Sequence, residues 1–332
     1  MVARQLCVLI GIVLVAVGVG WFTMIRMPGQ SHQGPLPPLT DEQRTLEQEL
    51  HSHVQQLAGQ IGERNVFRHD RLVMAADYIR TTLAGNGYEV RRQPYEVAGK
   101  ICENLEAEVR GSRRPDDIIV IGAHYDSVQG SPGANDNASG VAAMLALARA
   151  FAKTTPTRTL RFVAFTNEEP PLFQTKYMGS RVYAKRSRER GEKIVLMLSL
   201  ETIGYYSDEP GSQHLLFPLN LIYPSSGNFI AFVSNVGNGF RVRQLVGSFR
   251  QRAQFPSEGG ALWGLIPGVG WSDHWAFWKE GYPAVMVTDT ALFRYPAYHS
   301  NADRPEFVQY ERMARVVSGL HAVIAEMANA PK

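Results

Sequence analysis

Three short apolar runs in the chain are each followed within four residues by histidine or carboxylate side chains. The runs are residues 118–123, 160–165 and 194–200, and the polar residues after them are His124 with Asp126, Glu168 with Glu169, and Glu201. Imidazole and carboxylate groups bind divalent metals, and they also transfer protons in hydrolytic enzymes. The pattern therefore indicates a metal site or an acid–base site assembled from segments far apart in the sequence.

The runs lack the polar alternation of strands with one solvated face, and helix-like segments such as residues 139–151 separate them. Such strands are typical of a sheet with helices on both faces, so we predict an α/β fold with a mixed, largely parallel central sheet. In open sheets of this kind the carboxyl ends of the strands line the ligand-binding crevice. The polar residues are therefore expected to converge there.

Two further residues extend the set. Asp136 lies in the glycine-containing loop before the helix, and His299 follows a fourth apolar run at residues 284–287. Each residue alone has an ordinary explanation, because a single histidine is often hydrogen-bonded, an aspartate often caps a helix or shapes a turn, and a glutamate is often solvated. Together, two imidazoles and four carboxylates form a nitrogen and oxygen ligand set suited to zinc, manganese or cobalt.

Six segments occur in an order that is typical of one enzyme family. They are GAHYDS, GANDNASG, FTNEE, LSLETIG, SDHWAF and YHSNAD, in a match that covers about residues 70–320. With these motifs the chain resembles the M28 zinc exopeptidases, a family that includes bacterial leucyl aminopeptidases, glutamate carboxypeptidases and glutaminyl cyclases. The resemblance implies the zinc exopeptidase, phosphorylase/hydrolase-like fold with two Zn²⁺ ions per chain.

The resemblance also implies a role for each residue of the set. His124 and Glu201 would hold one zinc ion, Glu169 and His299 would hold the other, and Asp136 would bridge the two ions. Glu168 would act as the general base. Asp126 would orient the imidazole of His124. A cis peptide bond between Asp136 and Asn137 is implied as well. Asp273 and His274, in the fifth segment, are expected to support the site.

Glu201 departs from the family pattern, which usually has aspartate at this position. The extra methylene moves the carboxylate by one C–C bond, so the spacing or occupancy of the metal site at His124 is left open. The residues after Glu201 keep the pattern, which favours a substitution within a working site. Tyr298, beside His299, could stabilise a reaction intermediate or simply pack in the core.

The amino-terminal part of the chain has a different composition. Residues 6–25 contain no charge and lie between Arg4 and Arg26. A run of this length can span a bilayer, although a cleaved signal peptide and a buried helix are alternatives. We predict an anchor or signal at residues 1–26, a Pro/Gly linker at 27–38 that lifts the domain off the membrane, and a metallopeptidase domain at 39–330.

Charge and cysteine content exclude several other classes. The chain has 34 basic and 31 acidic residues, so no strong field favours nucleic acid as a partner. Its two cysteines, Cys7 and Cys102, do not form a disulfide framework. Thr40 and Gln43 have the spacing of a capping box, which predicts that a helix begins there.

The predicted function is a membrane-anchored zinc exopeptidase, in particular an aminopeptidase acting on peptides with a free amino terminus. Its partners would be these peptides and, through residues 6–25, a lipid bilayer, with the catalytic domain extracytoplasmic, or secreted if the segment is cleaved. One alternative is a single-zinc glutaminyl cyclase that uses only Asp136, Glu169 and His299. Another is a non-catalytic ectodomain with the same fold. The sequence does not indicate an oligomeric state.

Overall fold

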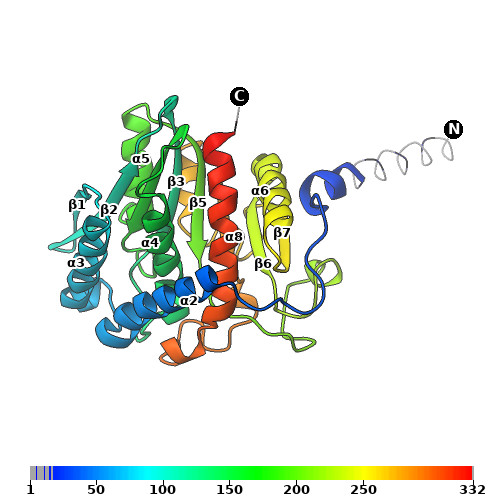
Figure 1. The fold of residues 1–332 in the computed structure, drawn as a ribbon, viewed down its shortest axis with the longest axis horizontal. Helices are drawn as coiled ribbons and strands as arrows, with labels where there is room; N and C mark the ends of the chain where they lie inside the picture. Colours follow the sequence, from blue (N-terminus) through cyan, green and yellow to red (C-terminus); the bar gives the residue numbers. More distant parts are fainter. Residues whose placement is uncertain (1–4, 6–10, 12–14, 16–17, 331–332) are drawn as a thin grey trace.

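The four apolar runs are strands in one eight-stranded sheet (Figure 1). The strands are β3 (Arg114–His124), β4 (Arg158–Phe165), β5 (Lys193–Glu201) and β8 (Ala284–Thr288). β3 pairs in parallel with β4 and β5, and β5 pairs in parallel with β8. The computed structural model describes residues 5, 11, 15 and 18–330. The expected α/β class with a mixed, largely parallel sheet is confirmed.

Four further strands complete the sheet in the order β1-β2-β4-β3-β5-β8-β6-β7. They are β1 (Arg91–Val97), β2 (Lys100–Val109), β6 (Ile230–Asn235) and β7 (Ser257–Leu262). β1 and β2 form an antiparallel hairpin, and β2 also runs antiparallel to β4. β6 is antiparallel to β8 and parallel to β7, which is one of the two edge strands.

Helices cover both faces of the sheet. On one face the core includes residues of α2 (Asp41–Val54), α3 (His69–Gly85), α4 (Gly140–Phe151), α6 (Gly239–Arg252) and α8 (Tyr310–Asn329). On the other face it includes residues of α5 (Gly179–Glu189) and α7 (His274–Lys279). β4 shows the alternation that two covered faces require, because Phe162 packs in the first core and Phe165 in the second.

Short helical segments connect these elements. They are η1 (Trp21–Ile25), η2 (Gln55–Ile61), η3 (Val66–Arg68), η4 (Ala134–Ser139), η5 (Leu219–Leu221), η6 (Val236–Asn238), η7 (Ala291–Phe293) and η8 (Pro305–Phe307). The predicted capping box is confirmed at the start of α2. There the Thr40 hydroxyl accepts from the amide of Gln43 and the Gln43 side chain accepts from the amide of Thr40, both at 3.2 Å.

Half of the predicted membrane span at residues 6–25 lies outside the described residues. Within the described part of the chain, no helix is both long and apolar enough to cross a bilayer. The Pro/Gly segment that follows lies along α6, β7 and α8. Met27 in this segment is buried in the core, and the Ser31 hydroxyl accepts a hydrogen bond from the amide of Ser257 at 2.8 Å. The segment therefore contributes to the packing of the domain.

α7 begins with His274, whose ring is fully buried. The ring Nε2 lies 2.8 Å from the carbonyl oxygen of Val269, and the ring stands edge-on to Trp278 with 4.5 Å between centroids. Burial lowers the pKa of His274 to about 4, although the contact with the Val269 carbonyl opposes this shift. The folded protein therefore favours the neutral imidazole.

The packing of residues 27–38 gives a prediction for stability. Met27→Ala should lower the free energy of unfolding by about 2–3 kcal/mol, because it removes a buried side chain next to Gly259 and leaves a cavity. Gln33→Ala, at an exposed position of the same segment, is the matched control and should be nearly neutral. Urea denaturation measures both; equal stability of the two variants would contradict the packing.

A second prediction concerns pH. The unfolded chain protonates His274 near its ordinary value of 6.5, whereas the folded protein does so only near 4, so acidification favours unfolding. Between about pH 7 and about pH 5 this histidine should cost about 2 kcal/mol of stability. His274→Gln should remove that part of the profile. Urea denaturation at each pH, with a chelator present to exclude metal binding, measures the free energy of unfolding. If this free energy changes with pH in the same way for the unmodified protein and for His274→Gln, the assignment is contradicted.

Candidate metal centre

The carboxyl ends of three neighbouring strands bring the predicted residues together. His124 and Glu201 are the last residues of β3 and β5, and Glu168 and Glu169 follow β4. Asp136 lies in η4 and His299 in the loop between η7 and η8. The strand-end residues and Asp136 are buried, and the His299 side chain is 31% exposed. The site is thus a largely buried cluster at the carboxyl ends of the central strands.

Asp136 lies between two histidines. Its Oδ1 is 3.3 Å from Nε2 of His124, and its Oδ2 is 3.1 Å from Nε2 of His299. Glu201 Oε2 is 3.3 Å from the same His124 nitrogen, and Glu169 Oε2 is 3.3 Å from the same His299 nitrogen. The arrangement is two half-sites, each with one imidazole and one glutamate, that share a single aspartate.

The donor atoms suit a metal ion. His124 Nε2 and Asp136 Oδ1 are buried and have no hydrogen-bond partner among the described residues. One ligand atom each from His124, Asp136 and Glu169 lies within 4.8 Å of the others. Buried polar atoms without partners are costly, and a divalent cation with nitrogen and oxygen ligands would satisfy them. The residues present therefore fit the implied zinc.

Burial and mutual repulsion also favour a cation here. Burial raises the pKa of Glu168 well above its ordinary range, and the charges of Glu201 and Glu169 add to the increase, although His124 opposes it. Burial, with the charge of Asp136, raises the pKa of Glu169 to about 8. Nearby positive charge stabilises carboxylates in such a cluster as anions. Metal ions would supply it.

Asp126 fixes the turn that carries the two glutamates. Its carboxylate oxygens accept hydrogen bonds from the backbone amides of Glu168 and Glu169 at 3.1 and 3.0 Å. His124 Nδ1 lies 3.2 Å from the backbone carbonyl oxygen of Asp126 and 3.6 Å from its carboxylate. The closer partner of the imidazole is thus the carbonyl, while the carboxylate holds the neighbouring loop.

Asp303 holds the loop of Asp136, and the sequence did not reveal it. Its two carboxylate oxygens accept from the backbone amides of Asn135 and Asp136 at 2.8 and 3.0 Å. The hydroxyl of Tyr295 donates to the same carboxylate at 2.9 Å. Asp303 is the last residue of the motif YHSNAD, but nothing in its spacing indicated that it binds backbone amides of a segment so distant in sequence.

Asn137 connects the same loop to the end of β5. Its side-chain amide donates to the carbonyl of Leu200 and accepts from the amide of Thr202, at 2.8 and 3.0 Å. The peptide bond between Asp136 and Asn137 is cis, as the family resemblance implied. The loop of Asp136 is therefore tied directly to the residues on either side of Glu201.

Arg64 is a fully buried cation behind the site that sequence reasoning also missed. Its guanidinium donates to the carbonyl oxygens of Tyr125 at 2.7 Å and Gly133 at 2.8 Å. Burial lowers the pKa of Arg64 to about 10, whereas the charges of Asp126 and other nearby carboxylates oppose this shift. Arg64 thus links the two ends of the loop between β3 and η4.

Three residues at the site have left-handed backbone conformations without being glycine. Their φ angles are 58° at Asn167, 43° at Thr202 and 54° at His299. Each residue is a candidate ligand or lies directly beside one of the glutamates. Such conformations are uncommon for these residue types and are kept where the surroundings enforce them, as at functional sites.

Glu201 has a hydrogen-bonding partner of its own. The hydroxyl of Ser272 donates to Glu201 Oε2 at 2.7 Å, and the hydroxyl of Ser199 lies 2.8 Å from that of Ser272. The longer glutamate is therefore oriented by a serine from the motif SDHWAF. The next residue, Asp273, is fully buried, and neither of its carboxylate oxygens has a hydrogen-bond partner among the described residues.

An apolar pocket opens beside the cluster. Glu201 and Tyr298 form part of its wall at the metal-centre end, and it encloses about 840 Å³ of space, the open mouth included. Strand residues of β6 and β8 line it together with residues of three loops, among them Ala231, Val233, Met286, Leu215, Phe229, Ile266, Trp271 and Phe293. Tyr298 stacks on His299 with 3.9 Å between ring centroids. The pocket suits an apolar group held next to the metal ligands.

Several known proteins are similar to this chain in sequence. The chain is 37% identical over 292 residues to Uncharacterized protein YfbL of Escherichia coli (strain K12), a match that covers 85% of this chain and 88% of that protein. A Probable zinc metalloprotease of Leptosphaeria maculans is 26% identical over 271 residues, which cover 72% of this chain and 60% of that protein. The chain thus spans less than two thirds of that fungal relative.

Solved structures share the fold. The zinc aminopeptidase BSAP from Bacillus subtilis superposes with a TM-score of 0.70 at 16% identity, over 86% of this chain and 95% of that one. The glutaminyl cyclase of Fimbriiglobus ruber superposes with a TM-score of 0.61 at 21% identity, over 90% of this chain and 99% of that one. At these identities the similarity shows the fold alone.

The family model described as Peptidase family M28 matches residues 104–324, a range that contains the described cluster from His124 to His299. This match agrees with the resemblance in the six motifs. The chain therefore belongs to peptidase family M28.

Proposed function

We propose that this protein is a zinc-dependent aminopeptidase that hydrolyses peptides with an apolar amino-terminal residue. The observation that carries the proposal is the placement of two histidines on opposite oxygens of Asp136, each with its own glutamate. A single ion needs only one such half-site. The shared aspartate supports two ions, and two-metal sites are suited to hydrolysis.

The ligands for the two ions follow from the half-sites. His124 and Glu201 would hold one Zn²⁺, His299 and Glu169 the other, and Asp136 would contribute one oxygen to each. When bound, the ions polarise the substrate carbonyl and lower the pKa of water. Zinc is supported by the metalloprotease relatives and by the nitrogen and oxygen donors of the cluster.

Glu168 is left free for proton transfer. Its Oε2 is 3.9 Å from His124 Nε2, whereas oxygens of Asp136 and Glu201 lie 3.3 Å from the same nitrogen. Glu168 is therefore not part of either half-site. Glu168 would accept a proton from the attacking water and donate it to the amine that leaves. Burial raises its pKa well above the ordinary range, and this strengthens the Glu168 carboxylate as a base toward the water.

The pocket beside Glu201 supports the choice of substrate. Its wall is mostly apolar, and it reaches from the metal ligands to strands β6 and β7. A side chain next to the hydrolysed bond would enter it and lose contact with water, which favours leucine-like and aromatic residues. The fold similarity to the zinc aminopeptidase from Bacillus subtilis supports a substrate with a free amino terminus.

A glutaminyl cyclase is the second candidate. The fold similarity to the Fimbriiglobus ruber enzyme supports it, and so does Glu201, since a changed ligand at the His124 half-site would matter little to an enzyme with one zinc. The complete His124 half-site, with Ser272 orienting Glu201, favours the peptidase.

The role of Glu168 can be tested by Glu168→Gln. This variant should keep about two zinc ions per chain, because Glu168 is outside both half-sites, but its kcat on aminoacyl-anilides should fall by about 10²- to 10⁴-fold. Plasma emission spectroscopy gives the metal content and a colorimetric assay gives the rate. Glu209→Gln, at an exposed carboxylate, is the control and should retain activity. A Glu168→Gln enzyme with full activity would remove the assigned role.

A substrate panel separates the two candidate functions. Leucyl- and phenylalanyl-anilides should be hydrolysed with kcat/KM about 10- to 100-fold higher than glutamyl-anilide, because the apolar wall rejects a charged side chain. An amino-terminal glutaminyl peptide should be cleaved or left intact, with no loss of ammonia. Mass spectrometry distinguishes hydrolysis from cyclisation, and efficient cyclisation by a His124→Ala variant would identify the single-zinc cyclase.

A further inference from the structure

The end of the uncharged amino-terminal segment is attached to the catalytic domain. η1 (Trp21–Ile25) lies against the start of α6, where the carbonyl oxygen of Thr23 comes so close to Gly239 that an added Cβ would be 3.0 Å away. Arg243 donates to the carbonyl oxygens of Phe22, at 2.6 Å, and Arg26. Met24 packs against the main core. The hydrophobic segment therefore reaches the domain without a free spacer.

The residues after η1 continue this attachment. Arg250 donates to the carbonyl oxygens of Pro28 and Gly29 at 3.3 and 3.2 Å. Arg315, at the far end of the segment, donates to the carbonyl oxygen of Pro37 at 2.6 Å. With the buried side chain of Met27, these contacts hold residues 27–37 along the surface of α6, β7 and α8. A composition rich in proline and glycine predicts a flexible linker, but the contacts describe a fixed strap.

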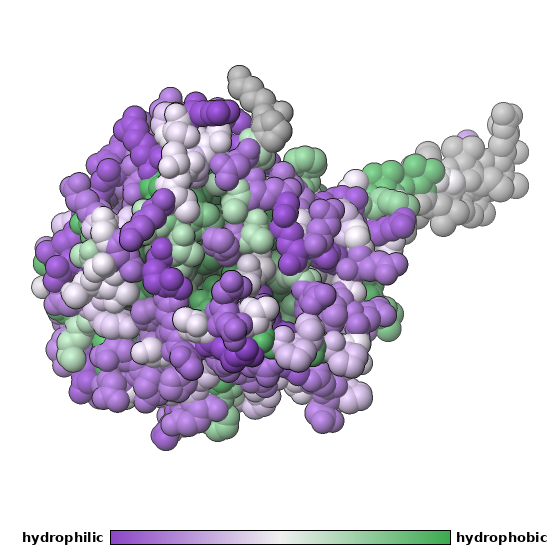
Figure 2. Space-filling model, viewed as in Figure 1, coloured by the Kyte–Doolittle hydropathy of each residue, from purple (hydrophilic) through white to green (hydrophobic). Residues whose placement is uncertain are grey.

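An exposed apolar surface surrounds the point where the chain enters the domain. Trp21, Phe22, Val236 and Phe240 are 45%, 54%, 41% and 72% exposed. Arg26, Arg241 and Arg243 lie among them, and the guanidinium groups of Arg26 and Arg241 sit 4.9 and 5.8 Å from the ring centres of Phe22 and Phe240. We call these seven residues the η1–α6 face. Figure 2 shows the apolar residues before Arg26 projecting from a mostly hydrophilic surface.

The composition of the η1–α6 face fits a bilayer surface. Aromatic side chains accumulate at the boundary between lipid headgroups and acyl chains, and arginines beside them bind anionic headgroups. The face also continues directly from the run of uncharged residues at 6–25, which is long enough to span a bilayer. A protein partner would not explain why the face surrounds the end of this run.

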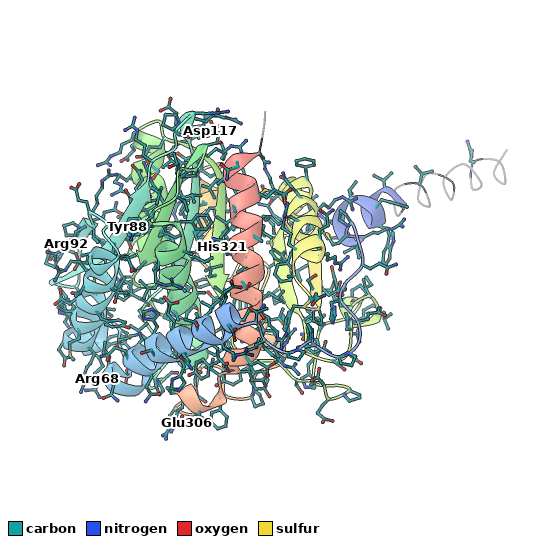
Figure 3. All side chains as sticks on the ribbon, viewed as in Figure 1. Arg68, Tyr88, Arg92, Asp117, Glu306 and His321 are labelled. Carbon is teal, nitrogen blue, oxygen red and sulfur yellow. The ribbon has the colours of Figure 1, made fainter. Side chains whose placement is uncertain are left out.

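The metal centre lies toward the end of the sheet opposite the η1–α6 face. Thr288 pairs with both Glu201 and Ala231, so β6 starts beside the metal centre and leads away from it to η6 and α6. Figure 3 labels Asp117, in β3, at one end of the molecule and Glu306, in η8, at the other. Figure 1 shows η1 beside α6, away from the end that carries η8.

We propose that the η1–α6 face rests on the headgroup region of a lipid bilayer and that the strap holds the catalytic domain there in one orientation. Phe240 and Phe22 enter the interface, the three arginines contact phosphate groups, and the metal-centre end stays clear of the lipid. The catalytic domain then contacts the membrane surface directly, instead of being held away from it by a flexible linker. This inference does not depend on the proposed catalytic function.

Fluorescent labels on the full-length protein in nanodiscs test the proposal. Phe240→Cys places a nitrobenzoxadiazole label on the η1–α6 face, and Phe307→Cys places the same label at another exposed phenylalanine, in η8. Both are made with Cys7→Ala, and the remaining cysteine, Cys102, is buried. With spin-labelled lipid in anionic nanodiscs, quenching at Phe240 should exceed quenching at Phe307 several-fold.

A variant without the strap hydrogen bonds tests whether the strap fixes the orientation of the domain or only tethers the domain to the membrane. Arg243→Ala with Arg250→Ala removes hydrogen bonds to the strap and should reduce the difference between the two labels. Three results would overturn the proposal: equal quenching at both positions in the parent protein, no quenching at Phe240, or cross-linking of Phe240→Cys between two copies within one nanodisc. Failure of the full-length protein to enter nanodiscs would overturn it as well.

Discussion

The site depends on one constraint, which is that Asp136 must present both carboxylate oxygens to different histidines at the same time. A carboxylate on a mobile loop would rotate and satisfy only one of them. The carboxylate of Asp303 binds the backbone amides on the amino side of Asp136, and the side chain of Asn137 binds both sides of Glu201. Arg64 holds the carbonyl that precedes the loop. The strands of the sheet direct the ligands toward the site, but these polar contacts fix the position of the Asp136 carboxylate.

The sequence predicted the parts of the fold that carry a strong local signal. Buried parallel strands read as continuous apolar runs, and the residues at their ends identified the edge where they converge. β2 gave no such signal, because KICENLEAEV contains helix-forming glutamate, alanine and leucine. Its glutamates are paired across the sheet, as in the 2.7 Å contact between Glu108 and Arg161. A strand stabilised by distant charges cannot be recognised from its own residues.

The candidate ligands could be predicted, but the groups that orient them could not. Histidines and carboxylates in familiar motifs are visible in a sequence, whereas the contacts of Ser272, Asp303 and Arg64 depend on which backbone atoms the fold brings within 3 Å of them. Glu201 illustrates the difference. From sequence it is a ligand with one methylene too many; in the structure its Oε2 lies 3.3 Å from the same imidazole nitrogen that Asp136 approaches, and the Ser272 hydroxyl donates to that same Oε2.

Asp303 and His299 also determine when the centre can form during synthesis. Both residues are in the last part of the 332-residue chain, while the segments that they complete begin near residue 124. A ribosome releases the amino-terminal strands long before these two side chains emerge, so the emerging chain holds at most the His124 half-site. The second half-site, and with it the proposed pair of metal ions, can therefore form only after residue 303 has emerged. For a chain that is moved across a membrane while unfolded, the ions would come from the compartment in which it folds.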